Sequence, residues 1–316
     1  MSAQVQYMEL GGPEVLRYVE IPTPTAGAGQ VVVETRAIGV NPIDSKLRSG
    51  ARPSPPFTGP RAPGSDAAGV VVETGDGVDG WSVGDEVFLR GAHGTYATHV
   101  VASVDQLVQK PAALGWDEAA AIGVPASTAY QALKSLGVEL GTTVLVHGGS
   151  GAVGQAAIQF ARNWGATVIA TGGERNQARM GELGAIPVEY GHGLLENIRA
   201  AAPGPIDAVL DAAGTDEALQ VSLELVADRS RIGTVVAGAR AAELGILAWA
   251  GGNPLPLSDE DQAWRAEAYA VAAVLIELGE FEVEIGARYP LRAAAEAQRA
   301  SMSGEVRGKI ILDPRG

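Results

Sequence analysis

Hydrophobic and polar positions follow two different patterns along the chain, and the change between them lies near residue 122. Before that point, short runs rich in β-branched residues are separated by turns that contain glycine and aspartate. The runs cover residues 30–39, 68–75 and 95–102. This pattern predicts a compact antiparallel β-domain, which we expect to be barrel-like. The proline-rich stretch 52–63 predicts a long loop without regular structure, and such loops often line functional sites.

After residue 122, short apolar runs alternate with segments of helical periodicity. The predicted strands cover residues 143–147, 166–170, 186–189, 207–211 and 232–237. The helical period is clearest in residues 151–164 and 215–226. This alternation predicts an α/β fold with a doubly wound parallel sheet. From about residue 281 the pattern reads strand, helix, strand, over residues 283–286, 293–302 and 308–312, and this tail could complete the first domain.

The most informative motif is a glycine-rich turn between a predicted strand and a predicted helix. The apolar run from Val144 ends in Gly149, Gly151 and Gly154, spaced G-x-G-x-x-G, and a helical pattern follows at once. A dinucleotide pyrophosphate needs this layout: the first glycine allows the tight turn, the second lets the backbone approach the phosphates, and the third lets the helix pack against the strand. Because glycine makes up 42 of the 316 residues, the spacing alone is weak, and a turn that only connects strand and helix is the alternative. Its position between strand and helix favours a nucleotide site.

The residues after the second predicted strand of this α/β region indicate which dinucleotide binds. NAD-binding proteins usually place an acid there to bond the ribose 2′-hydroxyl, whereas NADP-binding proteins leave space and supply a cation. Here Gly172 and Gly173 leave room for a 2′-phosphate, and Arg175 can pair with it. Glu174 is either the ribose acid or the first-turn acid of the next helix, and its distance from the apolar end of the strand favours the second interpretation. The predicted cofactor is therefore NADPH.

Composition and charge exclude several classes of function. The net charge of −14 argues against nucleic acid or an anionic membrane as the main partner, because both require a basic surface. The chain has no cysteine, which excludes disulfides, thiolate nucleophiles and zinc sites built on sulfur. Its four histidines show no metal-ligand spacing, so no metal site is expected. Without a signal-peptide pattern or an apolar run long enough to span a bilayer, the sequence predicts a soluble cytoplasmic protein.

Motifs occur in a fixed order over nearly the whole chain, in residues 39–50, 62–72, 77–87, 94–97, 128–133, the glycine-rich turn and residues 304–312. Together they resemble the medium-chain dehydrogenase/reductase superfamily, and specifically its zinc-free quinone oxidoreductase (zeta-crystallin-like) branch. The resemblance implies a GroES-like β-barrel catalytic domain and a Rossmann domain with a doubly wound parallel sheet. Residues 1–122 with 281–316 would form the first, and residues 123–280 the second. It also implies a homodimer that acts on a small-molecule substrate.

The positions of the zinc ligands carry other residues in this chain. Zinc-dependent relatives have a cysteine where Asn41 stands and a His-Glu pair where Ser65 and Asp66 stand. Without a Lewis acid, removal of an alcohol proton is disfavoured, so the resemblance implies hydride transfer from NADPH to a quinone or to the β-carbon of an enone or enoyl thioester. The choice between these acceptors stays open. An NADPH-binding structural or regulatory protein fits the same motifs, and the unusual segment 241–256 is a slight hint of a specialised biosynthetic enzyme.

The resemblance also assigns roles residue by residue. The pyrophosphate is expected on the residues of the glycine-rich turn, which are Gly149, Ser150, Gly151, Ala152, Val153 and Gly154. The 2′-phosphate is expected beside Gly173, Arg175 and Tyr190. Lys309 is expected on the phosphate side of the cofactor, and Asn41 and Thr128 near the nicotinamide.

Two cations distinguish the expected catalytic region from that of some relatives. Some quinone reductases of the branch have tyrosines where this chain has Lys46 and Arg52. Lys46 can donate a hydrogen bond or proton to the carbonyl oxygen of the acceptor as the enolate charge develops; the alternative is an exposed lysine in a helical turn. Arg52 either binds an anionic group of the substrate or is a solvated loop cation. We also expect Asp66 to bond backbone amides near a turn, and His147 to be a packed histidine rather than a catalyst.

Overall fold

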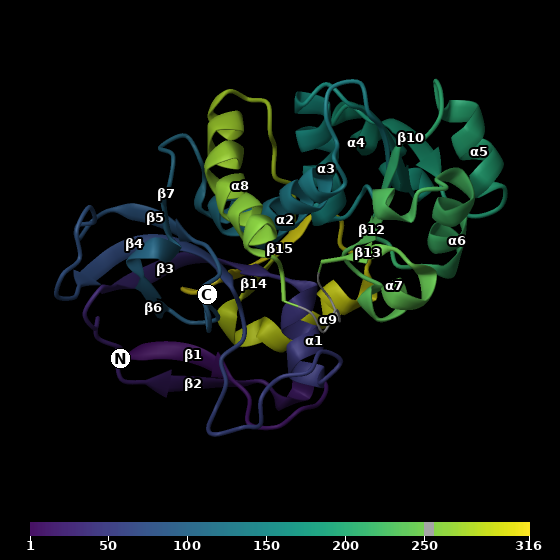
Figure 1. The fold of residues 1–316 in the computed structure, drawn as a ribbon. Coiled ribbons are helices and arrows are strands. Elements are labelled where there is room, and N and C mark those ends of the chain that lie inside the picture. Colours follow the sequence, from purple (N-terminus) through teal and green to yellow (C-terminus); the bar gives the residue numbers. More distant parts are fainter. Residues whose placement is uncertain (250–255) are drawn as a thin grey trace. The chain divides into compact units, whose positions relative to one another are not determined.

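The computed structural model describes residues 1–249 and 256–316, which belong to two compact units (Figure 1). The first unit comprises Met1–Val124, Tyr269–Glu277 and Val283–Gly316, and the second comprises Pro125–Ala268 and Leu278–Glu282. The C-terminal tail therefore groups with the N-terminal residues. The segment Tyr269–Glu277, within the range predicted for the Rossmann domain, also groups with the first unit. Among the described residues, no helix is long and apolar enough to cross a membrane.

A seven-stranded sheet is the framework of the first unit. Its strands are β3 (Gln30–Val40), β4 (Asp66–Thr74), β5 (Glu86–Leu89), β6 (His99–Ser103), β7 (Leu107–Gln109), β14 (Ile285–Pro290) and β15 (Lys309–Asp313). They are ordered β14-β15-β3-β4-β5-β7, and β6 pairs with β3 outside this path. All pairs are antiparallel except β14 with β15. The long strand β3 pairs with three others, so the ends of strands that are distant in sequence meet beside it.

Shorter elements complete the first unit. Strands β1 (Ser2–Gln6) and β2 (Arg17–Ile21) form an antiparallel ribbon. Helix α1 (Pro42–Ser49) follows β3, helix α9 (Ala294–Ser303) lies between β14 and β15 in sequence, and the 3₁₀ turns are η1 (Pro13–Val15), η2 (Val104–Gln106) and η5 (Leu291–Ala293). The core joins Val33 and Ile38 of β3 with Ala297 and Leu312 of the tail, all fully buried. The tail thus supplies both strands and core side chains, which explains why it groups with the N-terminal residues.

The second unit contains a six-stranded parallel sheet. Its strands are β8 (Thr143–His147), β9 (Thr167–Gly172), β10 (Ile186–Glu189), β11 (Ala208–Asp211), β12 (Ile232–Thr234) and β13 (Leu247–Ala248). The spatial order is β10-β9-β8-β11-β12-β13, with every neighbouring pair parallel. In chain order this is 3-2-1-4-5-6, the order of dinucleotide-binding sheets, so the predicted doubly wound sheet is confirmed. The five predicted strands are present, and the sixth, β13, is too short for its pattern to be recognised.

Helices connect these parallel strands, as a parallel sheet requires. They are α3 (Ala152–Asn163), α4 (Gln177–Glu182), α5 (Leu194–Ala201), α6 (Asp216–Leu225) and α7 (Gly238–Leu244), with 3₁₀ turns η3 (Glu174–Asn176) and η4 (Arg229–Arg231). Two longer helices, α2 (Trp116–Ser135) and α8 (Asp259–Glu277), contain residues of both units. Thr215 caps α6 because its hydroxyl accepts a hydrogen bond from the backbone N–H of Ala218.

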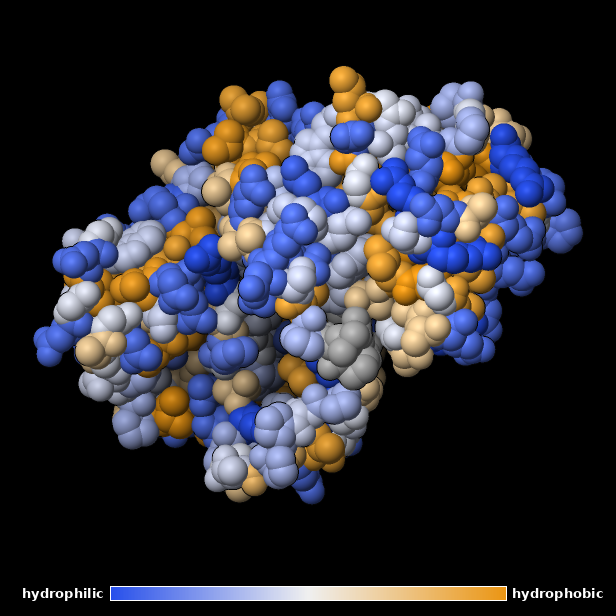
Figure 2. Space-filling model, viewed as in Figure 1, coloured by the Kyte–Doolittle hydropathy of each residue, from blue (hydrophilic) through white to orange (hydrophobic). Residues whose placement is uncertain are grey.

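Figure 2 shows hydrophilic and hydrophobic residues interspersed over the face in view.

Candidate active site

The glycine-rich turn follows β8, next to the point where the strand order reverses between β8 and β11. Ligands of open α/β sheets bind at this switch point, beyond the carboxyl ends of the strands. The left-handed residue of the turn is Gly148, with φ of 75°, and not Gly149 as the spacing predicts. Gly149 is required for another reason, since a Cβ atom there would lie 2.8 Å from Ala170 Cβ and from Met180 Sδ. The sequence has two adjacent glycines here, Gly148 and Gly149. The G-x-G-x-x-G spacing begins at Gly149, so the left-handed position was assigned to Gly149 instead of Gly148.

The last two glycines of the turn shape the start of α3. A Cβ atom on Gly154 would overlap the carbonyl oxygen of Gly148, so only glycine lets the helix approach the turn this closely. Gly151 is the N-cap of α3, and no side chain caps the backbone N–H groups of the first turn, which begins at Ala152 and Val153. Uncapped N–H groups and the positive end of the helix dipole fit a phosphate group. The residues predicted to hold the pyrophosphate therefore have a backbone arrangement suited to it.

The residues predicted to surround a 2′-phosphate lie at the end of β9. This strand runs to Gly172, two residues further than predicted, and Gly173 is the N-cap of the 3₁₀ turn η3. A Cβ atom on Gly173 would lie 3.1 Å from the Tyr190 hydroxyl, so these two predicted residues are neighbours. Glu174 and Arg175, both exposed, are the first two residues of η3. Glu174 thus starts a helical turn, in line with the favoured interpretation, although it follows the strand more closely than we expected.

Three strand ends of the first unit bring Asn41, Asp66 and Lys309 together. Asn41 follows β3, Asp66 begins β4, and Lys309 begins β15, and both β4 and β15 pair with the end of β3. The Lys309 ammonium donates to Asp66 Oδ2 at 2.9 Å and to the side-chain oxygen of Asn41. Asn41 Nδ2 donates to the same Asp66 oxygen at 2.8 Å. Val124 N–H also donates to the Asp66 carboxylate, at 3.1 Å. We call Asn41, Asp66 and Lys309 the buried polar triad.

The triad changes what Lys309 and Asp66 can do. Both side chains are 2 % exposed, and the Lys309 ammonium is engaged by two partners within the first unit. From the sequence, Lys309 is expected on the phosphate side of the cofactor, whereas here it lies beside Asn41. The expectation that Asp66 bonds a backbone amide agrees with its contact to Val124, and the carboxylate additionally carries the ion pair. Charge-assisted hydrogen bonds of this kind hold Asn41 in one orientation.

Asp44 and Tyr96 are functional candidates that the sequence analysis did not single out. Asp44 Oδ2 accepts the Asn41 backbone N–H at 2.9 Å and the Tyr96 hydroxyl at 3.0 Å. Burial raises the pKa of Asp44 to about 7, against the opposing effect of these two hydrogen bonds. Burial and the Asp44 carboxylate also raise the pKa of Tyr96. Asp44 could have been recognised in the sequence as a residue of the helix start, because an acid three residues after an N-cap asparagine is typical of that position.

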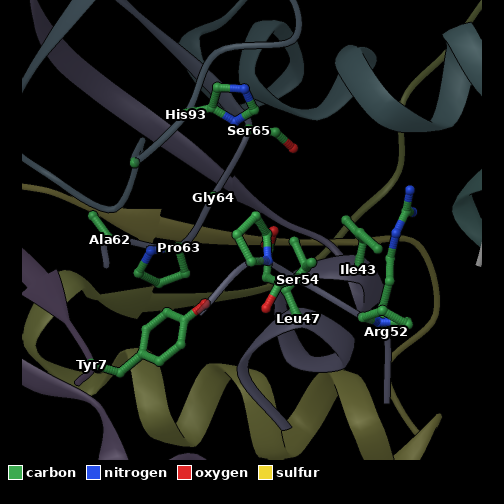
Figure 3. A pocket seen from close by; sticks show the side chains of 14 residues that line it. Tyr7, Ile43, Leu47, Arg52, Ser54, Ala62, Pro63, Gly64, Ser65 and His93 are labelled. Atoms are coloured by element: carbon green, nitrogen blue, oxygen red, sulfur yellow. The ribbon is translucent and has the colours of Figure 1, made fainter. Parts of the chain in front are cut away.

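A pocket of about 410 Å³ adjoins these residues in the first unit (Figure 3). It is lined by Tyr7, Ile43, Asp44, Leu47, Arg52, Pro53, Ser54, Pro55, Ala62, Pro63, Gly64, Ser65, His93 and Gly94. The proline-rich loop forms part of its wall, as the sequence predicts for residues 52–63. The hydroxyl of Ser65, one residue before Asp66, is buried and has no hydrogen-bond partner among the described residues. Apolar walls with a few polar groups are typical of small-molecule sites.

Lys46 and Arg52 are neighbours, and of the two only Arg52 is among the described residues that line this pocket. Lys46 lies in the last turn of α1, and the Arg52 backbone N–H donates to its carbonyl oxygen at 3.0 Å. Both side chains are half-buried, and Arg52 is part of the pocket wall. Burial lowers the pKa of Lys46, and the Arg52 charge lowers it further. Lys46 is therefore a better proton donor than an exposed lysine.

The remaining predicted residues lie in the second unit. Thr128 is a buried residue of α2. His147 is fully buried at the end of β8, and its Nδ1 lies 3.0 Å from the Thr171 hydroxyl. Burial lowers the pKa of His147 to about 4, so it stays neutral near pH 7, as expected for a packed histidine. Of the predicted pocket segment 241–256, residues 250–255 lie outside the described residues.

Comparison with protein families matches most of the chain. Residues 27–112 match the alcohol dehydrogenase GroES-like domain, and residues 183–312 match the zinc-binding dehydrogenase domain. The human quinone oxidoreductase is 34% identical over 328 residues, covering 98% of this chain and 96% of the relative.

Solved structures of dehydrogenases and quinone oxidoreductases have the same fold as this chain. A NAD-dependent alcohol dehydrogenase is 30% identical with a TM-score of 0.86, covering 99% of both chains. The quinone oxidoreductase of Escherichia coli, solved in complex with NADPH, is 25% identical with a TM-score of 0.84, covering 99% of this chain and 100% of the other.

Proposed function

The chain belongs to the quinone oxidoreductase branch of the medium-chain dehydrogenase/reductase superfamily, and on this premise we propose that it is an NADPH-dependent reductase of a quinone or an α,β-unsaturated carbonyl compound. The enzyme class follows from quinone oxidoreductases that match the full chain, and the choice of NADPH is supported by the relative solved with that cofactor. A homodimeric assembly and a cytoplasmic location are further parts of the proposal.

The observation that carries the proposal is the buried polar triad. Its Asn41 and Asp66 stand where zinc-dependent relatives have a cysteine and the glutamate of a His-Glu pair. The Lys309 ammonium donates a hydrogen bond to the side-chain oxygen of Asn41 and to that of Asp66. A cation therefore already occupies the oxygen atoms that would have to bind a metal. An amide, an ammonium and one carboxylate are a poor ligand set for zinc. We therefore propose that the reaction proceeds without zinc, on acceptors that need no strong Lewis acid.

The glycine-rich turn and the end of β9 fit the cofactor. The uncapped start of α3 would hold the pyrophosphate, and Gly173, Arg175 and Tyr190 would hold the 2′-phosphate. NADPH supplies a hydride when it is bound. Asn41, which the triad holds in place, and Thr128 are proposed to position the nicotinamide.

The acceptor is proposed to bind in the pocket of the first unit. There the Lys46 ammonium donates a hydrogen bond to the carbonyl oxygen of the acceptor, and then a proton, as negative charge develops on that oxygen. The lowered pKa of Lys46 favours this transfer. The apolar wall of the pocket excludes water from the reacting carbonyl.

A stopped-flow screen of NADPH oxidation tests the proposed function. We expect turnover with some members of a panel of quinones, enones, enals and enoyl-CoA esters, and a Lys46→Met variant with kcat lowered about 100-fold, the usual contribution of general acid catalysis. Product stereochemistry separates hydride delivery to carbon from reduction at oxygen. Stoichiometric NADPH binding without oxidation across the panel would instead support a binding protein. Full enone turnover by the Lys46→Met variant would remove Lys46 from the mechanism.

A further inference from the structure

Lys46 and Arg52 form a pair of like charges, and no acid among the described residues forms a salt bridge with either. Neither side chain forms a salt bridge among the described residues, although the net charge of the protein is −14. Each charge disfavours the other, as the effect of Arg52 on the pKa of Lys46 shows. Half-buried cations held together without a counter-charge are costly to the folded protein. An anion bound beside them would relieve this repulsion.

The surroundings of the pair offer little negative charge. Asp44 is the only carboxylate among the residues that line the pocket within the described part of the chain. Burial raises its pKa to about 7, so near neutral pH it is about half protonated. The nearest acid in sequence therefore compensates the two cations only in part.

The pocket wall also carries uncharged polar side chains. Arg52 lies beside Ile43 in the wall, and His93 and Ser65 lie close to each other at another part of the same wall (Figure 3). The Ser65 hydroxyl is buried and has no hydrogen-bond partner among the described residues. A guanidinium binds carboxylate and phosphate in two-point geometry, which neutral quinones and simple enones do not provide.

We propose that the physiological acceptor carries an anionic group, a carboxylate or a phosphate, and that Arg52 binds this group in the pocket. The proposal rests on the proposed function, because it names the class of acceptor for the same reduction. Two cations then face two negative charges. Arg52 faces the fixed anion of the acceptor, and Lys46 faces the charge that develops on the carbonyl oxygen. Arg52 is thus a specificity-determining residue rather than a catalyst.

Paired acceptors test this proposal with the full-length protein. The set is benzalacetone with a para-carboxylate, its para-phosphonate analogue, and the methyl ester of the carboxylate as the neutral counterpart. We expect kcat/KM to favour the anionic acceptors over the ester, and Arg52→Gln to reduce this ratio about tenfold or more, because a hydrogen bond to a charged group is lost. Arg52→Lys should retain part of the preference. Comparison of carboxylate with phosphonate tells which anion the site prefers.

A matched control separates the local effect from net charge. Arg315 is exposed near Asp313 and does not line the pocket. Arg315→Gln removes one positive charge and should leave the ratio of kcat/KM for anionic and neutral acceptors unchanged. Equal ratios in wild type and Arg52→Gln would overturn the proposal. So would an Arg52→Gln variant that loses NADPH affinity while its acceptor ratio stays the same, since Arg52 would then serve the cofactor.

A binding measurement decides the proposal even if no acceptor is reduced. The saturated ketones that correspond to the carboxylate and to its methyl ester are titrated calorimetrically into the NADP⁺ complex. Tighter binding of the carboxylate, lost in Arg52→Gln, supports the anion site independently of turnover. Equal binding of the two ketones overturns it. Failure of the screen with retained anion binding would reject the proposed function alone.

Discussion

The ammonium nitrogen of Lys309 lies 2.9 Å from Oδ2 of Asp66, and both side chains are buried although 243 residues separate them in sequence. The contact exists because β15, from the tail, and β4 both pair with β3. Asn41 joins the two and receives its orientation from them. The ion pair therefore ties the C-terminal tail to the start of β4, and its two members hold Asn41, the residue before α1 that we propose near the nicotinamide.

Replacing Lys309 by methionine should destabilise the protein by about 3–5 kcal/mol, because Asp66 would be left as an unpaired buried charge. Urea denaturation of wild type and variant measures the difference. The double variant Lys309→Met with Asp66→Asn removes both charges and should recover part of the loss. A single variant as stable as the wild type would show that the pair makes no such contribution.

The stability of the protein should depend on pH through Asp44. Its folded-state pKa of about 7 lies above its ordinary value of 3.8, so its stabilising contribution is complete below about pH 4 and is lost as the pH rises to about 7. The slope is at most about 1.4 kcal/mol per pH unit. An Asp44→Asn variant keeps an oxygen that can accept from Asn41 and Tyr96, but it does not titrate.

Thermal or urea unfolding of both proteins between pH 4 and pH 8 checks this dependence. The difference in stability should shift steadily in favour of Asp44→Asn as the pH rises. Parallel curves for the two proteins would mean that Asp44 does not titrate in this range.

Much of the second unit could be predicted from the sequence because its signals are local. Buried parallel strands appear as short apolar runs, and the predicted strand at 143–147 coincides with β8. The exact ends of the strands were harder to predict than their presence. The run predicted to end at residue 170 continues to Gly172, since its ladder with β10 extends to that glycine. The choice between Gly148 and Gly149 for the left-handed position depends on what surrounds each glycine, which spacing does not reveal.

The chemistry of the first unit could be predicted only in part. The sequence shows that Asn41 and Asp66 replace zinc ligands, but the partner of both is Lys309, which a distant strand brings to them. Asp44 looks like an ordinary helix-start acid, and its raised pKa arises from burial that only the folded chain creates. The predicted strand at 95–102 begins only at His99; of the residues before it, Ala97 forms an isolated bridge to Gln4 and Tyr96 donates a hydrogen bond to Asp44.

Cofactor preference should depend on Arg175. Replacing Arg175 by alanine should lower kcat/KM for NADPH about tenfold or more, because a charged contact to the 2′-phosphate is lost, and should change kcat/KM for NADH much less. Steady-state rates with both cofactors and one fixed acceptor give the ratio. Glu174→Ala is the matched control: loss of NADH turnover in that variant would identify Glu174 as the ribose acid. A wild type that prefers NADH would contradict the NADPH assignment.

The glycine-rich turn offers a pair of variants that separates folding from cofactor binding. Among the described residues, a Cβ atom on Gly151 would meet only the Gly148 carbonyl oxygen within 4 Å, at an ordinary 3.6 Å, and the φ of −75° suits alanine. Gly151→Ala should therefore keep the stability of the wild type within about 1 kcal/mol. It should still weaken NADPH binding, measured by fluorescence titration, because the added methyl group lies where the phosphates approach the backbone.

Gly154→Ala should behave differently, because its Cβ atom would overlap the Gly148 carbonyl oxygen and backbone must move to make room. We expect a loss of about 1–3 kcal/mol, as for other overpacked sites, together with weaker NADPH binding. If Gly151→Ala bound NADPH as tightly as the wild type, the phosphates would not pass close to this residue. Loss of stability in Gly151→Ala equal to that in Gly154→Ala would show that both glycines serve the fold, and that the turn contributes to cofactor binding only through its shape.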